Sequence, residues 1–255
     1  MSAPDANAAI GHPFLCNGRS DVLGHRGASH DRPPGNTMAA FRRTLEVGAD
    51  HIETDVQAGA DGRVVIFHDE TLDDTTTGSG RVGEHSWEYL CTLLYRVEGV
   101  PTDDGLVLLD DALAEFPDAF FNIDVKTDAT VRPAIEVLRS HGAARRVCVA
   151  AFGWRRQRRV RRDLGPGWCT AFSKWEIVTV RLAAWLRLPV PAWGDVVQLP
   201  PSRSGVAVVD RRLLDACHRR GVAVHVWTVN DPGQMERLRA LGVDAIITDR
   251  PDLAL

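Results

Sequence analysis

The sequence has few of the features that mark membrane-spanning or secreted proteins. No window approaches the roughly 20 uninterrupted apolar residues that span a bilayer. The most apolar stretch, 178–191, is interrupted by Arg181 and Arg187. The first 20 residues lack the basic start and the apolar run of a signal peptide. We therefore expect neither a transmembrane anchor nor secretion by this route.

Paired cysteines and an excess of positive charge are also absent. The five cysteines are odd in number and widely spaced, without a C-x-x-C pair: Cys16, Cys91, Cys148, Cys169 and Cys217. This pattern suggests neither a disulfide framework nor a thiolate zinc site, and it fits a reducing cytoplasm. The formal net charge of -4 and the pI near 6.1 give no general attraction for nucleic acid.

Short apolar, β-branched runs alternate with helix-period segments along most of the chain. The strand candidates are 22–24, 52–56, 64–67, 120–125, 147–152, 168–172, 196–199, 222–229 and 245–248. This alternation is typical of a parallel sheet covered by helices. The 255 residues also match the length of one barrel domain. We predict an α/β fold, a (β/α)8 TIM-type barrel of regular or irregular outline, in which at least one of the nine candidates lies outside the barrel. The weakest are 64–67 and 168–172.

The helix candidates carry clear boundary signals. They are 36–47, 109–116, 131–141, 210–220 and 232–241. Asp210 and Asp231 stand at N-cap positions, and Gly221 and Gly242 follow the last helical turns.

The connection between the second and third strand candidates is ambiguous. Only QAGADGR separates Val56 from Val64, which is too short for a helical crossover, and its D-G pair favours a hairpin. A regular hairpin would carry His68 to the end of the barrel opposite Glu53 and Asp55. We therefore predict an extended, irregular crossover that returns His68 to the C-terminal mouth.

The remaining segments suggest a simple domain organisation. Residues 69–108 contain the turn-rich strings TTTGSGR and PTDDG, which predict a small loop-rich excursion over the barrel mouth. We expect an N-terminal tail over 1–20 and a single barrel domain over 21–255.

Polar and ionisable side chains follow the predicted strands, where an α/β barrel places its active site. His25 and Arg26 end the first strand, and Gly27 lets the backbone turn. In the second strand, alternation points Glu53 and Asp55 to the same face. Two carboxylates on one buried face repel each other unless a cation holds them.

Two further strand ends complete this set. His68 stands next to Asp69 after the third candidate, and Asp124 shares a face with Lys126 on the next. Asp124 and the two carboxylates of the second strand offer oxygen ligands of the hard kind that Mg²⁺ or Ca²⁺ prefers, which predicts a divalent metal site. The side chains that remain for proton transfer and for the charge of a phosphate are His25, His68, Arg26 and Lys126.

The motifs around these residues occur in a fixed order. They are HRGAS, N-T-x-x-A-F, G-A-D-x-I-E-x-D-V, D-G-x-V-V-x-F-H-D-x-T-L, T-T-x-G-x-G, V-W-T-V-N and G-V-D-x-I-I-T-D-R-P. In this order and spacing the sequence resembles the glycerophosphodiester phosphodiesterase family, barrel enzymes of the phospholipase C-like type, from about His25 to Asp252. The stretch 145–209 contributes little beyond its strand rhythm.

The resemblance implies an enzyme that hydrolyses a small glycerophosphodiester to glycerol 3-phosphate and an alcohol. It makes His25 and His68 the acid and the base, in either order, and leaves water or a neighbouring glycerol hydroxyl as the nucleophile. The metal-ligand positions that match are Glu53, Asp55 and Asp124. The matching substrate positions are Arg26 and Lys126 at the phosphate and Trp227 in the pocket for glycerol or the alcohol.

Two positions depart from the family pattern. Gly35 stands where the family usually has a glutamate, which removes a carboxylate that would orient Arg26. Asp124 stands where the family has a longer glutamate, which would loosen or shift the metal. These departures keep a non-catalytic phosphate-binding barrel open as an alternative.

Two consecutive segments bear on a lipid substrate. The basic segment 153–162 would suit an anionic membrane surface, but we expect a solvated outer helix. The next segment has an apolar face that would suit an interfacial helix, but we expect ordinary packing against the barrel. The residues of this face are Trp175, Val178, Leu182, Trp185 and Leu186. Together the segments leave open a weak membrane-surface contact and a lysophospholipase D-type activity on membrane-derived lysophospholipids.

Overall fold

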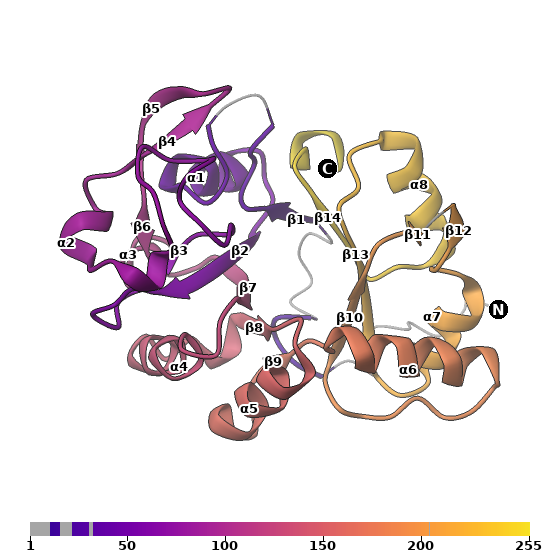
Figure 1. The fold of residues 1–255 in the computed structure, drawn as a ribbon. Helices are drawn as coiled ribbons and strands as arrows, with labels where there is room; N and C mark the ends of the chain where they lie inside the picture. Colours follow the sequence, from indigo (N-terminus) through magenta and orange to yellow (C-terminus); the bar gives the residue numbers. More distant parts are fainter. Residues whose placement is uncertain (1–10, 16–21, 31–32, 204) are drawn as a thin grey trace.

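Eight parallel strands form the central sheet of the protein, seen in a computed structural model that describes residues 11–15, 22–30, 33–203 and 205–255 (Figure 1). In chain order they are β1 (Val22–His25), β2 (His51–Ala58), β7 (Phe120–Val125), β8 (Val147–Ala150), β9 (Cys169–Thr170), β10 (Val196–Leu199), β13 (Ala223–Val226) and β14 (Ala245–Thr248). Neighbours are hydrogen-bonded from β10 through β13, β14, β1, β2, β7 and β8 to β9. A parallel bridge between Ala171 and Val196 then joins β9 to β10 and closes the ring. The expected (β/α)8 barrel is confirmed.

Helices cover the outside of the barrel (Figure 1). They are α1 (Met38–Glu46), α3 (Leu109–Glu115), α4 (Val131–Ser140), α5 (Trp154–Leu164), α6 (Lys174–Trp185), α7 (Arg211–His218) and α8 (Pro232–Leu241). The Asp210 and Asp231 side chains accept backbone hydrogen bonds at the starts of α7 and α8, as expected. Gly242 ends α8 with a φ of 98°, which a glycine adopts without steric cost.

Strand β3 (Val64–Ile66) corrects the predicted crossover. It pairs antiparallel with β2, with Val56 opposite Ile66 and Ala58 opposite Val64, so the connection is a hairpin. The backbone N–H of Phe67 donates to the carbonyl of Asp55 at 2.9 Å. Because β2 continues three residues beyond Asp55 before the turn, the returning strand reaches the level of Asp55 again. His68 therefore lies at the mouth, although the prediction of a crossover was wrong.

The same strand resolves the surplus of candidates. β3 lies outside the ring and pairs with β2 and β6 (Val107–Leu108). The other weak candidate, 168–172, contains β9 and belongs to the barrel. The segment 69–108 also holds a 3₁₀ turn (Val82–Glu84), α2 (Trp87–Leu90), β4 (Leu94–Val97) and β5 (Val100–Gly105). It thus contains more regular structure than the loops we expected, and it lies on the left in Figure 1.

Among the described residues, three short pieces remain outside the main elements. They are 3₁₀ turns at Ala143–Arg145 and Pro251–Leu253 and a small antiparallel pair, β11 (Ser202–Arg203) and β12 (Val206–Ala207).

Apolar side chains fill both faces of the sheet, as a parallel sheet requires. One layer lies between the strands and the outer helices, and another fills the barrel interior. At the N-terminal ends of the strands, Phe14 is buried and its ring centroid lies 5.0 Å from that of His51. Phe14 falls within the segment expected to be a tail, whereas Cys16, 1–10 and 16–20 lie outside the described residues.

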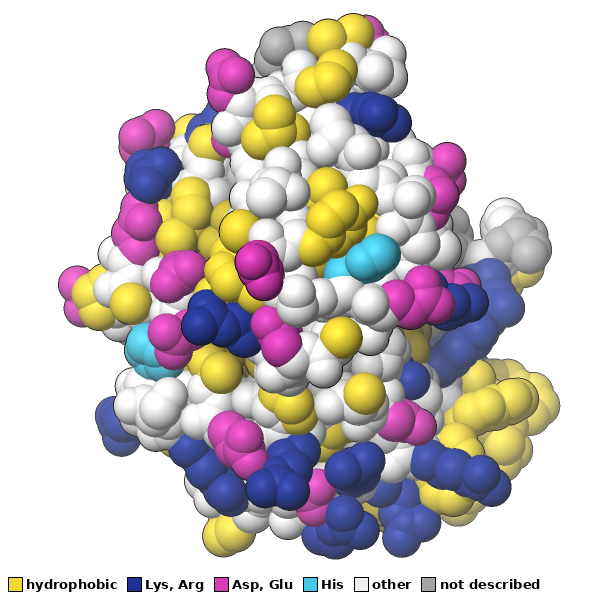
Figure 2. Space-filling model, turned by 60° about the vertical axis from the view of Figure 1, so that its left-hand side comes forward, with side chains coloured by type: hydrophobic (Ala, Val, Ile, Leu, Met, Phe, Trp, Pro, Cys, Tyr) yellow, Lys and Arg dark blue, Asp and Glu magenta, His cyan; other side chains and the backbone are white. Residues whose placement is uncertain are grey.

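Helix α5 is an outer helix with a solvated basic face, as expected. Only Gln157, Val160 and Leu164 are buried in it. Arg156 and Arg161 form ion pairs with Asp128 and Glu176, respectively. Figure 2 shows Lys and Arg side chains gathered along the lower edge of the molecule, beside a hydrophobic group at the lower right.

Helix α6 corrects a second expectation. It turns Val180, Ala183 and Ala184 toward the barrel. Two of these residues are alanines, so small side chains form much of the inward face. The face expected to pack inward is instead exposed: Trp175, Val178, Leu182, Trp185 and Leu186. In the described ranges, no helix has the length and apolar character needed to cross a bilayer.

Candidate active site

A pocket of about 190 Å³ opens at the C-terminal ends of the barrel strands. All eight side chains predicted from the sequence line it: His25, Arg26, Glu53, Asp55, His68, Asp124, Lys126 and Trp227. The lining residues that the sequence did not single out are Asn122, Phe152, Gln198, Thr228 and Ile247. Residues separated by up to some 200 positions in sequence thus share one small volume.

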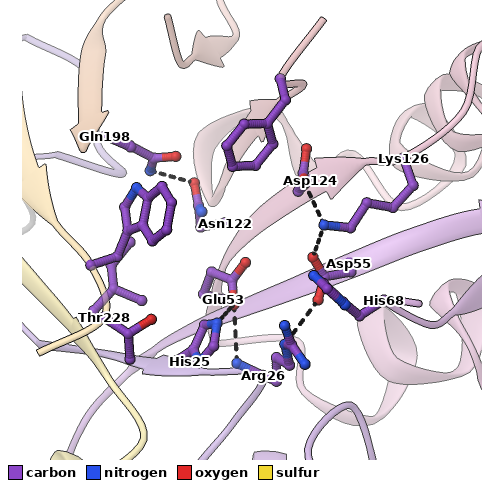
Figure 3. A pocket seen from close by; sticks show the side chains of 13 residues that line it. His25, Arg26, Glu53, Asp55, His68, Asn122, Asp124, Lys126, Gln198 and Thr228 are labelled. Carbon is purple, nitrogen blue, oxygen red and sulfur yellow. Dashed lines mark hydrogen bonds and ion pairs between the residues drawn. The ribbon is translucent and has the colours of Figure 1, made fainter. Parts of the chain in front are cut away.

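The turn after β1 aims Arg26 into the pocket. Arg26 and Gly27 both have positive φ, 52° and 81°. A side chain at Gly27 would bring its Cβ within 2.7 Å of the Ala40 backbone, so only glycine fits there. The Arg26 backbone N–H donates to Glu53 Oε2 at 3.0 Å, and its Nε lies 3.4 Å from Asp55 Oδ2 (Figure 3).

Each of the two histidines is held by a carboxylate on its Nδ1 atom. His25 Nδ1 lies 2.7 Å from Asp249 Oδ1, and His68 Nδ1 lies 2.7 Å from Asp69 Oδ1. A carboxylate can only accept, so each ring donates from Nδ1 and leaves Nε2 for a substrate. Asp249 is fixed in turn by the Asn230 amide, which donates to its Oδ2 at 2.7 Å.

The surroundings of His25 favour its charged form. Burial alone would lower its pKa, but the hydrogen bond to Asp249 and the negative charges of Glu53 and Asp249 raise the pKa above its ordinary value. Burial would likewise raise the pKa of Asp249, but the donors His25 and Asn230 hold it below its usual range. The pair is therefore built to keep a proton on His25.

Lys126 lies between two buried carboxylates. Its Nζ is 2.6 Å from Asp55 Oδ1 and 2.7 Å from Asp124 Oδ2 (Figure 3). Burial would lower the pKa of Lys126, but Asp55 and Asp124 raise it, so the side chain stays an ammonium. Burial would raise the pKa of Asp55, but Lys126, His68 and Arg26 together hold it below its usual range.

Glu53 and Asp124 are less well compensated. Burial, reinforced by the charge of Asp55, raises the pKa of Glu53 to about 7. Burial also raises the pKa of Asp124, although Lys126 opposes the shift. Among the described residues, Asp124 Oδ1 has no hydrogen-bond partner although it is buried. Glu53 and Asp124 thus lack part of the positive charge that would stabilise a buried carboxylate.

Aromatic rings form one wall of the pocket. Trp227 is half-buried and meets Phe152 edge to face, with ring centroids 5.9 Å apart. The Lys126 ammonium lies 5.7 Å from the centre of the Phe152 ring. The wall is therefore apolar opposite a strongly charged floor.

Comparison with known proteins decides the family. The model of the glycerophosphoryl diester phosphodiesterase family matches residues 25–253. The chain belongs to this family. It is therefore a phosphoric diester hydrolase, as expected, and the alternative of a non-catalytic barrel is not retained.

Relatives of this phosphodiesterase family match over nearly their whole length. The chain is 35% identical over 245 residues to "Probable glycerophosphodiester phosphodiesterase 2" of Mycobacterium tuberculosis, covering 94% of this chain and 91% of the relative. It is 31% identical to a glycerophosphodiester phosphodiesterase of Caldanaerobacter subterraneus subsp. tengcongensis, covering 91% and 94%.

Solved structures of the family share the fold. A glycerophosphodiester phosphodiesterase from Agrobacterium tumefaciens superposes with a TM-score of 0.74 at 26% identity, covering 91% of this chain and 97% of the other. An Oleispira antarctica phosphodiesterase in complex with the product sn-glycerol-3-phosphate gives 0.76 at 22% identity, covering 93% and 96%.

The structure gives a steric reason for one departure of this phosphodiesterase from the family pattern. A side chain at Gly35 would place its Cβ 2.9 Å from Arg26 Cβ and 3.3 Å from Ser29 Cβ. Arg26 thus occupies the space that a glutamate would need. The nearby carboxylate of Asp55, which lies 3.4 Å from Arg26 Nε, supplies negative charge beside Arg26 instead.

Several supporting residues were not singled out from the sequence. Asn36, with a φ of 64°, donates from Nδ2 to Asp55 Oδ2 at 3.1 Å and accepts from Thr54 at 2.8 Å. Asn122 accepts from Gln198 Nε2 at 2.9 Å across the pocket (Figure 3). Asp249 follows β14 directly, so the strand-end rule that selected His25 also applied to it.

Proposed function

We propose that the chain hydrolyses glycerophosphodiesters to glycerol 3-phosphate and an alcohol. The observation that carries the proposal is that two histidines, each oriented by a carboxylate, line one pocket together with buried carboxylates and two cations. At about 190 Å³ the pocket is below the usual range for drug-sized ligands, which suits a small polar group such as a phosphodiester. The names of the relatives support the glycerol-linked substrate.

The phosphate would be bound by positive charge. A phosphodiester resists a nucleophile until its nonbridging oxygens are neutralised. Arg26 and Lys126 are the cations that line the pocket, and both lie beside Asp55. We assign them to the nonbridging oxygens, where they would stabilise the charge that develops in the transition state.

The histidines would move the protons. One removes a proton from the nucleophile and the other donates a proton to the leaving oxygen, and each such transfer typically contributes about 10² to 10⁴-fold. Asp249 and Asp69 fix the rings and their tautomers, because each binds an Nδ1–H. His25, whose pKa is raised, suits the donor role at neutral pH, while either assignment is compatible with the contacts.

A divalent cation, Mg²⁺ or Ca²⁺, would be held by Glu53, Asp55 and Asp124. Within the part of the chain that the structure describes, no three His, Cys, Asp or Glu side chains are arranged as a ligand group, and Lys126 lies between two of these carboxylates. The three carboxylates nevertheless fit a hard cation. Asp124 Oδ1 is buried with no hydrogen-bond partner among the described residues, and the pKa of Glu53 is raised to about 7. When bound, such an ion would add positive charge at the phosphate oxygens.

Product analysis tests the proposal. Glycerophosphocholine is incubated with the enzyme, and the products are identified by phosphorus NMR, with His25→Ala as the control for contaminating activity. We expect glycerol 3-phosphate and choline. Phosphocholine and glycerol would contradict the proposed position of cleavage, and the absence of any turnover would contradict the substrate class.

A further inference from the structure

An apolar groove of about 690 Å³ adjoins the catalytic pocket. The two share Phe152, Gln198 and Trp227, so the aromatic wall of the pocket is also the inner end of the groove. The outer part is formed by helix α6, by Leu199 at the end of β10 and by Pro200, Arg203 and Val208 after it. A molecule whose phosphate lies in the catalytic pocket can therefore extend past Phe152 and Trp227 into this groove and stay in contact with the protein.

The outer wall of the groove consists of exposed apolar side chains. Val178, Leu182 and Trp185 are 47%, 51% and 61% exposed, and all three line the groove. Contiguous apolar surface of this kind on a folded protein usually marks a binding site. The inward face of α6 is formed by Val180, Ala183 and Ala184, so these three exposed side chains lie outside the core.

The charges at the groove have one sign. Lys174, Arg181 and Arg203 line it, and no acidic side chain does so among the described residues. Arg181 is held by Asp210, with Nη2 2.6 Å from Oδ2. An apolar channel edged by cations fits an amphiphile with an anionic group and a hydrocarbon tail.

The groove is also built by a part of the chain without family motifs. Its residues fall mainly in 152–208, whereas the motifs that identify the family cluster before 80 and after 225. We therefore relate the groove to the substrate specificity of this chain and not to the reaction common to the family.

We propose that the groove binds the single acyl chain of a lysophospholipid whose phosphodiester occupies the adjoining pocket. The inference rests on the proposed function and extends its substrate class. Water supplies the oxygen that bonds to phosphorus, the bond from phosphorus to the headgroup oxygen breaks, and the headgroup leaves as an alcohol after taking a proton. The other product is a lysophosphatidate, which keeps its acyl chain in the groove.

A chain-length series tests the proposal. The substrates are glycerophosphocholine and its hexanoyl, octanoyl and decanoyl lysophosphatidylcholine counterparts, each kept below its micelle concentration. Because each methylene that leaves water contributes up to about fourfold in affinity, kcat/KM should rise with every step. A flat or falling series would overturn the proposal, while turnover of glycerophosphocholine itself would leave the proposed function intact.

A matched pair of variants locates the effect. Leu182→Gln changes the groove, and Leu186→Gln changes an equally exposed leucine that does not line it. We expect Leu182→Gln to lower kcat/KM for the octanoyl substrate about fivefold or more while Leu186→Gln leaves it within about twofold. Equal losses in both variants would show that the effect does not depend on the residues that line the groove, and would overturn the proposal.

Binding provides a readout that does not depend on turnover. Trp185 and Trp227 both line the groove, so octanoyl lysophosphatidylcholine should change the intrinsic fluorescence in a saturable way. The Leu182→Gln variant should need a higher concentration of this lipid for the same change. If the wild-type protein shows no saturable binding, the acyl-chain site is wrong even if glycerophosphocholine is hydrolysed. If binding is seen without hydrolysis of any substrate, the proposed function fails and the groove stands.

Discussion

His25 Nδ1 lies 2.7 Å from Oδ1 of Asp249, a residue 224 positions later in the chain. The contact joins the end of the first barrel strand to the end of the last, which are neighbours in the closed ring. The carboxylate fixes the imidazole ring and raises the pKa of His25 against the effect of burial. We therefore propose that Asp249 is a positioning residue, which acts through His25.

The Asp249→Asn variant should reveal this role in its pH profile. Asparagine removes the negative charge that favours a charged His25, so the pKa of His25 should fall. The limb of the kcat/KM profile that His25 controls should move to lower pH, and kcat/KM should fall at least about tenfold. A shift of the basic limb would make His25 the acid, and a shift of the acidic limb would make it the base.

The control for this variant is Asp252→Asn, which removes a carboxylate that pairs with Arg250 near the same end of the chain. Its profile should match the wild type. If Asp249→Asn also leaves both limbs unmoved, the contact with Asp249 does not govern the proton on His25.

Removing either histidine should disable the chemistry and spare the fold. His25→Ala and His68→Ala should each lower kcat by at least about 10², because each removes one proton transfer. His85→Ala is the matched control, since His85 is half-buried in the excursion, bonds to the Ser79 carbonyl and does not line the pocket. Steady-state kinetics with circular dichroism checks both points. Near-wild-type turnover in either of the first two variants would show that histidine to be structural.

Asp124 should govern metal affinity if it is a ligand. Asp124→Asn removes a negative charge from a buried site and should weaken Mg²⁺ or Ca²⁺ binding at least about tenfold, whereas Asp124→Glu reaches further and should tighten it. Asp128→Asn, which alters an exposed carboxylate paired with Arg156, is the control. Dissociation constants measured calorimetrically that are identical for Asp, Glu and Asn would place residue 124 outside the coordination sphere.

A glutamate at position 35, where the resemblance places one in the family, should lower activity. Gly35→Glu brings a Cβ to within 2.9 Å of Arg26 Cβ, so it should displace Arg26 and lower kcat/KM for glycerophosphocholine. Gly35→Ala introduces the same crowding without a carboxylate, and the pair separates the two effects. A gain of activity in Gly35→Glu alone would show that the missing carboxylate matters more than the space.

Much of the fold followed from local sequence patterns. The alternation of β-branched runs with helix-period segments gave the barrel, because parallel strands buried on both faces must be apolar and must be joined by helices. Caps such as Asp210 and Asp231 marked helix starts because their side chains accept backbone hydrogen bonds. The candidate site residues at strand ends were selected because a barrel collects the C-terminal ends of its strands at one mouth, whereas Trp227 came only from the resemblance to the family.

The wrong predictions arose where a sequence pattern does not show how long a strand is or which face of a helix points inward. Nothing in QAGADGR shows that β2 runs three residues past Asp55, which is what lets a hairpin return His68 to the mouth. Likewise, the stripe on α6 defines a face but not which way it points, and the small residues Ala183 and Ala184 took the inward side. Asp249 directly follows β14, so its place at the mouth was predictable, but its contact with His25 was not, because the two residues lie at opposite ends of the sequence.

The most direct test of a metal-dependent phosphodiesterase is turnover of glycerophosphocholine in excess chelator, before and after a divalent cation is restored. Because Glu53, Asp55 and Asp124 offer only oxygen ligands, we expect chelation to abolish the release of glycerol 3-phosphate and added Mg²⁺ or Ca²⁺ to restore it. Full activity in the chelator would show that hydrolysis does not depend on a metal.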